Sequence, residues 1–359
     1  MPRGPLVLTL DAGGTSFVFS AIRDGREAMG AITLPSLGDD LDACLNQIRR
    51  GFERVHEQTG REARAISFAF PGPADYPRGI IGDLANLPGF RGGVALGPML
   101  EDHFRLPVFI HNDADLFALG EASVGCLPEV NAALKAAGNP FRHRTLLGLT
   151  LGTGFGAGIV TDGRLLRGDN ASGGSIWLVR SKRFPECFAE EGVSLRAVKR
   201  AYAEAAGLAF EVSPDPRRIA DIARGTSPGN WEAAREAFRL LGEAAGDALA
   251  TALALVDGLA VIGGGLSGAA DLFMPALMAE LNGTLAKRDG GRVPRLESTV
   301  FNLEDVKDEA AFLDPARGPS KRVGICVTRL GTARATALGA WTLAVEALSP
   351  ARCPRPLRR

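Results

Sequence analysis

Glycine and threonine cluster at three points where an apolar segment of this chain ends. The clusters are Gly13-Gly14-Thr15, Gly152-Thr153-Gly154 and Gly263-Gly264-Gly265. Glycine has no Cβ and accepts positive φ, so turns of this kind let backbone N–H groups come close to phosphate oxygens. A single cluster would be interpreted as an ordinary hairpin turn. Three clusters in one chain favour a site that holds a triphosphate.

Two carboxylates stand at predicted strand ends. Asp11 directly precedes the first glycine cluster, where a carboxylate is costly without a partner. Mg²⁺ held through water on a phosphate would supply that partner; the alternative is that Asp11 caps the hairpin turn.

Asp113 follows the predicted strand Val108–Ile110, at the sheet edge where α/β proteins bind ligands. From there its carboxylate could take a proton from a substrate hydroxyl as general base. The local sequence leaves two alternatives open. Either Asp113 caps the helix that follows, or Asp115 caps it while Asp113 faces the ligand.

The elements that must position these residues form an approximate internal repeat. Leu8–Ile22 and Leu147–Val160 each predict a strand, a Gly/Thr turn and a second strand, and each is followed by an Asp-Gly-Arg hairpin turn. Helical and strand patterns alternate along the chain, which indicates the α/β class. We expect helices over Asp39–His56, Ala114–Val124, Ser194–Ala206, Trp231–Leu255, Leu272–Leu281 and Thr332–Leu348, and further strands over Ala65–Phe70, Val108–Ile110 and Leu259–Ile262.

A length of 359 residues and two related halves predict two domains. We expect an N-terminal domain over residues 1–116, completed by the helix 332–348. A C-terminal domain would span 117–331, and the Pro/Arg tail 349–359 would be disordered.

Composition excludes several classes of protein. The 41 basic and 41 acidic residues cancel, which removes the charge expected of a nucleic-acid binder. A hydrophobic fraction of 46% is ordinary for a globular chain, and no apolar run is long enough to span a membrane. Five widely spaced cysteines predict reduced thiols in the cytoplasm rather than a disulfide framework.

The motifs together resemble a known family. Asp11-Ala12-Gly13-Gly14-Thr15 is similar to the first phosphate motif of the actin, Hsp70 and sugar-kinase superfamily. The ROK family (repressors, open reading frames and kinases) is resembled more closely, over about Leu6 to Leu348. The segments that carry this resemblance are Asn86–Phe90, Asn112–Ala114 with Ala118–Glu121, Leu151–Gly158 and, for adenosine, Gly263–Ser267.

The resemblance implies an ATP-dependent kinase for a hexose or N-acetylhexosamine hydroxyl, built from duplicated ribonuclease-H-like domains with ATP in the cleft between them. It implies a homodimer as well. Asp113 would be the base and Asn112 would contact the sugar, with Gly72 and Asn86 in the same substrate site. The implied ATP site comprises Asp11, Gly13, Gly14, Thr15, Gly152, Thr153, Gly154, Gly263, Gly264 and Gly265, with Asp11 holding Mg²⁺ through the ATP phosphates.

This chain departs from the family pattern after the second phosphate motif. Ser172–Trp177 lacks the Glu and His of the usual Gly-Glu-x-Gly-His segment, and only Cys187 remains of the zinc cluster. One thiol cannot supply the four ligands of structural zinc, so we expect no zinc. Glu190 either replaces the family's sugar-binding glutamate or is an exposed acidic residue at a helix start. Trp177 could stack on a sugar face.

Three other functions compete with the kinase. A ROK regulator would need a helix-turn-helix segment before the first strand, and the strand begins at Leu6. A catalytically altered sugar or nucleotide sensor would explain the missing Glu and His, although both phosphate turns and Asn112-Asp113 are retained. A dinucleotide-dependent oxidoreductase would need its glycines between a strand and a helix, whereas the chain continues as a strand after Gly154.

Overall fold

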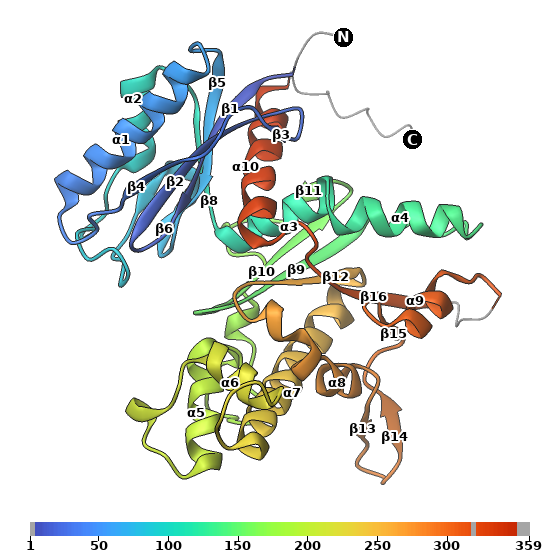
Figure 1. Ribbon diagram of the computed structural model, residues 1–359. Helices are drawn as coiled ribbons and strands as arrows, with labels where there is room; N and C mark the ends of the chain where they lie inside the picture. Colours follow the sequence, from blue (N-terminus) through green and yellow to red (C-terminus); the bar gives the residue numbers. More distant parts are fainter. Residues whose placement is uncertain (1–3, 317–320, 350–359) are drawn as a thin grey trace. The chain divides into compact units, whose positions relative to one another are not determined.

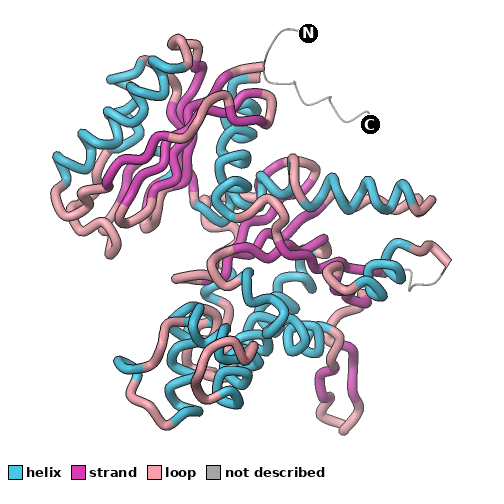
Figure 2. The backbone as a smooth tube through the Cα atoms, in the orientation of Figure 1, coloured by secondary structure: helices cyan, strands magenta, loops and turns pink. Residues whose placement is uncertain are grey.

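A computed structural model describes residues 4–316 and 321–349. The chain forms two compact units, each combining helices and strands (Figure 2). One unit contains the chain up to Leu116 together with the chain from Thr336 onward, and the other runs from Phe117 to Ala335. The predicted tail after Ser349 lies outside the described residues. Within the described ranges, no helix is long and apolar enough to cross a membrane.

The first unit is built on a mixed sheet in the order β3-β2-β1-β5-β8, with β4 beside β2. β1, β5 and β8 are parallel to one another, and β2 is antiparallel to β1. The carboxyl ends of the three parallel strands therefore lie at one edge of the sheet. The strands are β1 (Leu6–Ala12), β2 (Ser16–Arg23), β3 (Arg26–Glu27), β4 (Ile32–Pro35), β5 (Ala63–Ala69) and β8 (Val108–His111), with the small pair β6 (Ala74–Asp75) and β7 (Ile80–Ile81) after β5.

Helices cover both faces of this sheet (Figure 1). α1 (Leu41–Gln58) and α2 (Leu96–Phe104) share a core with the alternate strand residues that include Leu8 and Phe68. On the other face, α10 (Thr332–Leu348) packs Trp341 and Ala344 against Val7, Ala65 and Phe109. Period-two alternation along β1 and β5 thus buries both faces, as expected of central strands.

The second unit has a sheet in the order β11-β10-β9-β12-β16-β15. β9, β12, β16 and β15 are parallel, and β10 is antiparallel to β9. The strands are β9 (Thr145–Leu151), β10 (Phe155–Thr161), β11 (Arg164–Leu165), β12 (Leu259–Gly263), β15 (Thr299–Asn302) and β16 (Arg322–Val327). The helices are α3 (Asp113–Ser123, which crosses the boundary between the units), α4 (Cys126–Ala136), α5 (Leu195–Ala206), α6 (Pro216–Ala223), α7 (Trp231–Val256), α8 (Ala270–Leu281) and α9 (Val306–Leu313), and a hairpin is formed by β13 (Thr284–Ala286) and β14 (Arg292–Pro294).

The predicted internal repeat is confirmed. β1, β2 and β3 recur as β9, β10 and β11, with the same antiparallel pairing. The second turn of each copy is an Asp-Gly pair in the left-handed region: φ is 52° and 71° at Asp24 and Gly25, and 52° and 75° at Asp162 and Gly163. Two consecutive residues with positive φ define the turn that matches the twist of a hairpin.

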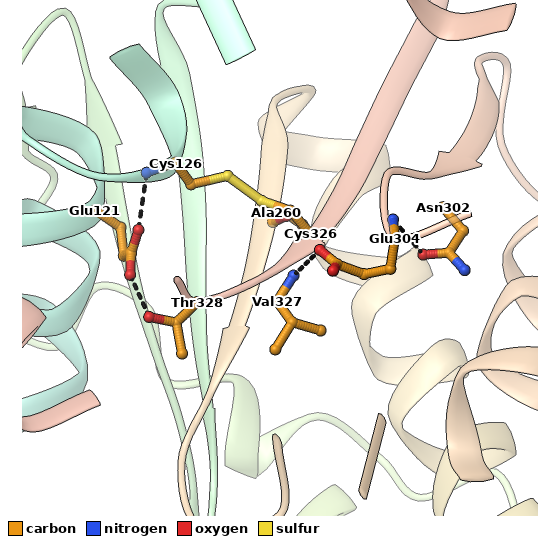
Figure 3. Close-up of a disulfide and its surroundings, with 8 residues drawn as sticks. All are labelled: Glu121, Cys126, Ala260, Asn302, Glu304, Cys326, Val327 and Thr328. Atoms are coloured by element: carbon orange, nitrogen blue, oxygen red, sulfur yellow. Dashed lines mark hydrogen bonds between the residues drawn. A yellow bond between two sulfur atoms is a disulfide. The ribbon is translucent and has the colours of Figure 1, made fainter. Parts of the chain in front are cut away.

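The prediction that all cysteines are reduced is wrong. Cys126 and Cys326 form a disulfide although 200 residues separate them in the sequence (Figure 3). Cys126 begins α4 and Cys326 lies in β16, so the fold brings together two cysteines that share no local motif. Spacing along the chain reveals only short-range pairs, which is why it missed this one. Among the described residues, Cys44 and Cys187 are free.

Candidate functional site

The predicted site residues of the first unit gather where its parallel strands end. Asp11 is near the end of β1, Gly72 follows β5, and Asn112 and Asp113 follow β8. β5 pairs with both β1 and β8 in parallel register, so these loops leave the sheet at the same edge. The position is the one that ligands take in open α/β sheets.

Asn112, and neither aspartate, caps helix α3. Its Oδ1 accepts hydrogen bonds from the N–H of Ala114 at 2.9 Å and of Asp115 at 3.3 Å. Asp113 is the first residue of the helix, and its Oδ1 also accepts from Ala114 N at 2.9 Å. The alternative that Asp115 is the cap is therefore wrong. Asp113 stays accessible to solvent at the head of the helix.

The pKa of Asp113 is raised above its ordinary value. The main cause is desolvation by the surrounding protein, and the neighbouring carboxylates Asp115 and Asp11 add to it, against the hydrogen bond from Ala114 N. Burial also raises the pKa of Asp11. Asp11 makes no side-chain hydrogen bond within the described part of the chain, and the turn after it is closed by the backbone, so it is not a hairpin cap.

Three residues that the sequence analysis did not assign to the site support this loop. The Tyr76 ring stacks on the His111 ring, with centroids 5.5 Å apart, and its hydroxyl donates to Phe70 O at 3.0 Å. Burial raises the pKa of Tyr76 to about 12, against a hydrogen bond with Asn112. Asp115 is buried, with Oδ2 3.1 Å from His111 Nδ1. No sequence signal separated Tyr76 from an ordinary turn residue.

The first glycine turn lies beside Asn86. Gly13 N donates to Ser16 O at 3.0 Å and closes the turn between β1 and β2. A Cβ on Gly13 would lie 2.8 Å from the same oxygen, and a Cβ on Gly14 would lie 3.3 Å from Asn86 O. The fold thus joins a predicted phosphate turn and a predicted sugar residue, while Thr15 is exposed at the tip.

In the second unit, the other two glycine clusters lie side by side. β9 and β12 are paired in parallel with Gly263 opposite Thr150, so both turns leave the sheet together. A Cβ on Gly152 would lie 3.7 Å from Gly265 N, whereas a Cβ on Gly265 would meet no atom within 4 Å. Gly264 has φ of +88°. Gly152 N donates to Gly154 O at 2.9 Å and Gly264 N donates to the hydroxyl oxygen of Thr332 at 2.8 Å, while the space beside Gly265 is open.

Glu190 lies directly on the second glycine turn. It belongs to the short helix η3 (Ala189–Glu191), and its Oε2 accepts from Phe155 N at 3.0 Å. A Cβ on Gly154 would lie 2.7 Å from the same oxygen. The alternative of a merely exposed helix start is wrong, because Glu190 is partly buried and held by the turn. Trp177 is 40% exposed and contacts Phe188 edge-on.

The residues around Cys187 do not fit a structural zinc ion. Its thiol is free and exposed. Over the ranges that the structure describes, no three His, Cys, Asp or Glu side chains are grouped to hold a metal. Structural zinc needs four such ligands, so no step of the chemistry is assigned to it.

Comparison with known proteins identifies the family. Residues 7–301 match the ROK family. The chain belongs to the ROK family. It is similar to the crystal structure of a glucokinase from Parabacteroides distasonis, at 50% identity and a TM-score of 0.85 over 97% of this chain and 99% of that one.

Two further comparisons agree. A glucokinase from Thermotoga maritima is 28% identical over 77% of this chain and 87% of its own length. A ROK family glucokinase from Streptomyces griseus, solved with glucose and AMPPNP, shares the fold at 22% identity and a TM-score of 0.64, over 94% of this chain and 98% of its own. The predicted α/β fold class is confirmed, and this ROK protein is an ATP-dependent sugar kinase.

Proposed function

We propose that this ROK kinase transfers the γ-phosphoryl group of ATP to a hydroxyl of glucose, with Asp113 as the base. The observation that carries the proposal is the accessible Asp113 at the head of α3, whose raised pKa suits it to accept a proton. Glucose is preferred as acceptor because relatives named glucokinase match most of the chain. N-acetylhexosamine is the alternative acceptor.

The first unit supplies the groups that act on the sugar. Asn112 uses its Oδ1 to cap α3, which leaves its amide N–H groups to donate to a sugar hydroxyl or to Tyr76. Asp113 takes the proton of the attacking hydroxyl as the new P–O bond forms. Gly72 and Asn86 complete this side of the sugar site, and the Tyr76–His111 stack fixes the loop that carries Asn112.

The second unit supplies backbone groups for the nucleotide. One wall of this nucleotide site is formed by Gly152, Thr153 and Gly154, and the other by Gly263, Gly264 and Gly265. The two walls are close, because a Cβ on Gly152 would lie 3.7 Å from Gly265 N. Glu190, fixed on Phe155 N, accepts hydrogen bonds from sugar hydroxyls next to the phosphate turn. Phosphoryl transfer depends mainly on such positioning.

The described residues fit a magnesium ion but not a structural zinc ion. Asp11, with no side-chain hydrogen bond among the described residues, would hold Mg²⁺ through water, and Mg²⁺ when bound neutralises phosphate charge. We propose no structural zinc and a homodimer. Near-stoichiometric zinc that remains after dialysis would contradict the absence of structural zinc. A monomeric mass in light scattering would contradict the homodimer.

A coupled ADP-release assay tests the proposed reaction. Glucose, N-acetylglucosamine, N-acetylmannosamine, mannose, fructose and allose are compared at equal concentration, with Asp113→Asn as the matched control. We expect the highest kcat/KM with glucose and almost none in the variant. A preference for an N-acetylhexosamine would correct the acceptor alone, whereas activity that survives in Asp113→Asn would remove the assigned base.

A further inference from the structure

A short segment after β16 runs beside the strand that carries the third glycine cluster. Cys326 pairs with Val261 in the parallel ladder. The contact continues beyond the strand, because Thr328 N donates to Ile262 O at 2.9 Å. It ends at the glycine turn, where Gly264 N donates to the hydroxyl oxygen of Thr332 at 2.8 Å. The segment 326–332 is therefore attached along its length to the nucleotide turn.

Thr332 holds the first peptide of that turn. Gly264 has φ of +88°, and a Cβ there would overlap the backbone of Leu151. Its N–H points to Thr332 and is not available to a ligand. The next residue, Gly265, faces open space. The Gly264–Thr332 hydrogen bond therefore fixes the peptide between Gly263 and Gly264, and the following peptide is held by Ser267, whose N–H and hydroxyl donate to Gly264 O at 3.0 and 2.7 Å.

The other end of the segment is held by the disulfide. Cys326 is joined to Cys126, the first residue of α4. Beside the disulfide, the fully buried Glu121 accepts from Cys126 N at 2.8 Å and from the hydroxyl of Thr328 (Figure 3). The start of the segment is therefore bonded both covalently and by hydrogen bonds to the α3–α4 corner.

The disulfide borders a small cavity. Both cysteines line a cavity of about 60 Å³, together with Glu129, Phe312 and Arg329. The two side chains are otherwise buried, so only a small thiol would gain access.

We propose that Cys126–Cys326 is a reversible redox site whose state sets the ATP affinity of the glycine turn through Gly264 and Thr332. This inference rests on the proposed nucleotide site. A low-molecular-weight dithiol is the reductant. Its thiolate attacks one cysteine sulfur and the S–S bond breaks; its second thiol then resolves the mixed disulfide. Two electrons and two protons reach the cysteines, and the dithiol becomes a cyclic disulfide.

Reduction removes the covalent anchor and leaves the segment 326–332 held by hydrogen bonds alone, and we expect this to weaken the Gly264–Thr332 hydrogen bond. Loss of one neutral hydrogen bond corresponds to about a three- to tenfold change in affinity. We expect ATP affinity to fall by that factor on reduction. Glucose affinity should not change, because the segment contacts no residue assigned to the sugar.

The test measures binding by calorimetry with the full chain, using Mg²⁺-ATP and, separately, glucose. Cys187→Ser and Cys353→Ser serve as background, so that only Cys44 and the disulfide remain. Oxidised protein is compared with protein treated with dithiothreitol, and alkylation followed by mass spectrometry reports the redox state. Thr332→Val removes the acceptor oxygen, while Thr332→Ser keeps it.

Three results are expected together. Reduction and Thr332→Val each weaken ATP binding, Thr332→Ser does not, and reduction of Thr332→Val has no further effect because both changes act on the same bond. Equal ATP affinity before and after reduction, with only a lower melting temperature, would overturn the redox inference. Additive effects would overturn the route through Thr332. Failure of oxidised wild type to bind ATP would instead remove the proposed nucleotide site.

Discussion

The two copies of the strand–turn–strand repeat have the same strand order and antiparallel pairing but different chemistry. In the first copy, Asp11 lies near the end of β1, and its negative charge contributes to the raised pKa of Asp113. In the second, Thr150 takes the corresponding place in β9, opposite Gly263 of β12. One carboxylate in the second unit, Glu190, reaches its turn from outside the repeat. The first copy is therefore the acidic half, and the second has an uncharged threonine at the same place.

Under the proposed function, this difference lets the two units contribute different chemical groups. A phosphate-rich nucleotide is bound best by uncharged N–H groups in glycine turns, whereas a hydroxyl that must lose a proton needs a carboxylate. A carboxylate base and a bound phosphate at the same turn would repel each other, because both are negatively charged. On the proposed assignment, Asp11 of the first copy acts on the nucleotide only through Mg²⁺, while the second copy has no carboxylate of its own beside its glycine turn.

The largest effect should come from the acidic half. Asp113→Asn keeps the shape of the side chain and can still accept from Ala114 N, but it cannot take a proton. We expect kcat to fall roughly 10²- to 10⁴-fold, with ATP affinity and melting temperature nearly unchanged. Stopped-flow or coupled ADP release measures kcat. Asp115→Asn is the matched control, and a larger loss in that variant would move the base to Asp115.

The pH dependence should report the carboxylates around the base. Asp113 must be deprotonated to act, and its pKa is raised by desolvation and by Asp115 and Asp11. Activity should therefore fall as the pH drops, starting above the range of an ordinary aspartate, by about tenfold per pH unit once below that pKa. Asp115→Asn removes one like charge and should shift this limb to lower pH. An unshifted profile would contradict the assigned coupling.

The second copy is tested best at Gly265. A Cβ there meets no protein atom within 4 Å, so Gly265→Val should fold normally and crowd only a bound ligand. We expect at least about a tenfold loss of ATP affinity and little change in glucose affinity by calorimetry. Gly264→Val is unsuitable because its Cβ would overlap Leu151. Gly154→Val would displace Glu190 and disturb both sites. Wild-type ATP affinity in Gly265→Val would place the nucleotide elsewhere.

Glu190 tests whether the second half also contacts the sugar. Glu190→Gln keeps an oxygen for Phe155 N but loses the charge that accepts strongly from sugar hydroxyls. The KM for glucose should rise about threefold to tenfold, while the KM for ATP should stay constant or fall, since an anion near the phosphate turn is removed. Glu191→Gln, next to it and paired with Arg196 and Arg200, is the control. Equal KM values for glucose would remove Glu190 from the sugar site.

Sequence reasoning succeeded where the signal was local. The repeat, the glycine turns and the helix over Thr332–Leu348 follow from patterns within one element. The prediction of the capping residue of α3 was wrong. Asn112, Asp113 and Asp115 are all residue types that cap helices well, and only the folded structure decides among them. The disulfide was missed for the opposite reason. Its two cysteines share no local sequence motif, and the pairing of β16 with β12 brings Cys326 into place.

Side-chain networks around the site were also beyond prediction. Tyr76 and His111 are placed against each other by the parallel ends of β5 and β8, which no one-dimensional pattern encodes. Glu190 was singled out by a family resemblance, but its contact with Phe155 N depends on how the chain returns from Ser172 to the second turn. Such contacts position the side chains of the proposed site, but no local sequence pattern predicts them.

The smallest expected effect concerns the part of the repeat that both copies kept. Gly25 and Gly163 have φ of 71° and 75°, so Ala at either position should cost about 1 kcal/mol of unfolding free energy. Gly30→Ala is the control, because it lacks positive φ and its Cβ meets nothing within 4 Å. Urea denaturation followed by circular dichroism measures the loss, and kcat should stay at wild type. Unequal losses at Gly25 and Gly163 would show that the two turns are no longer equivalent.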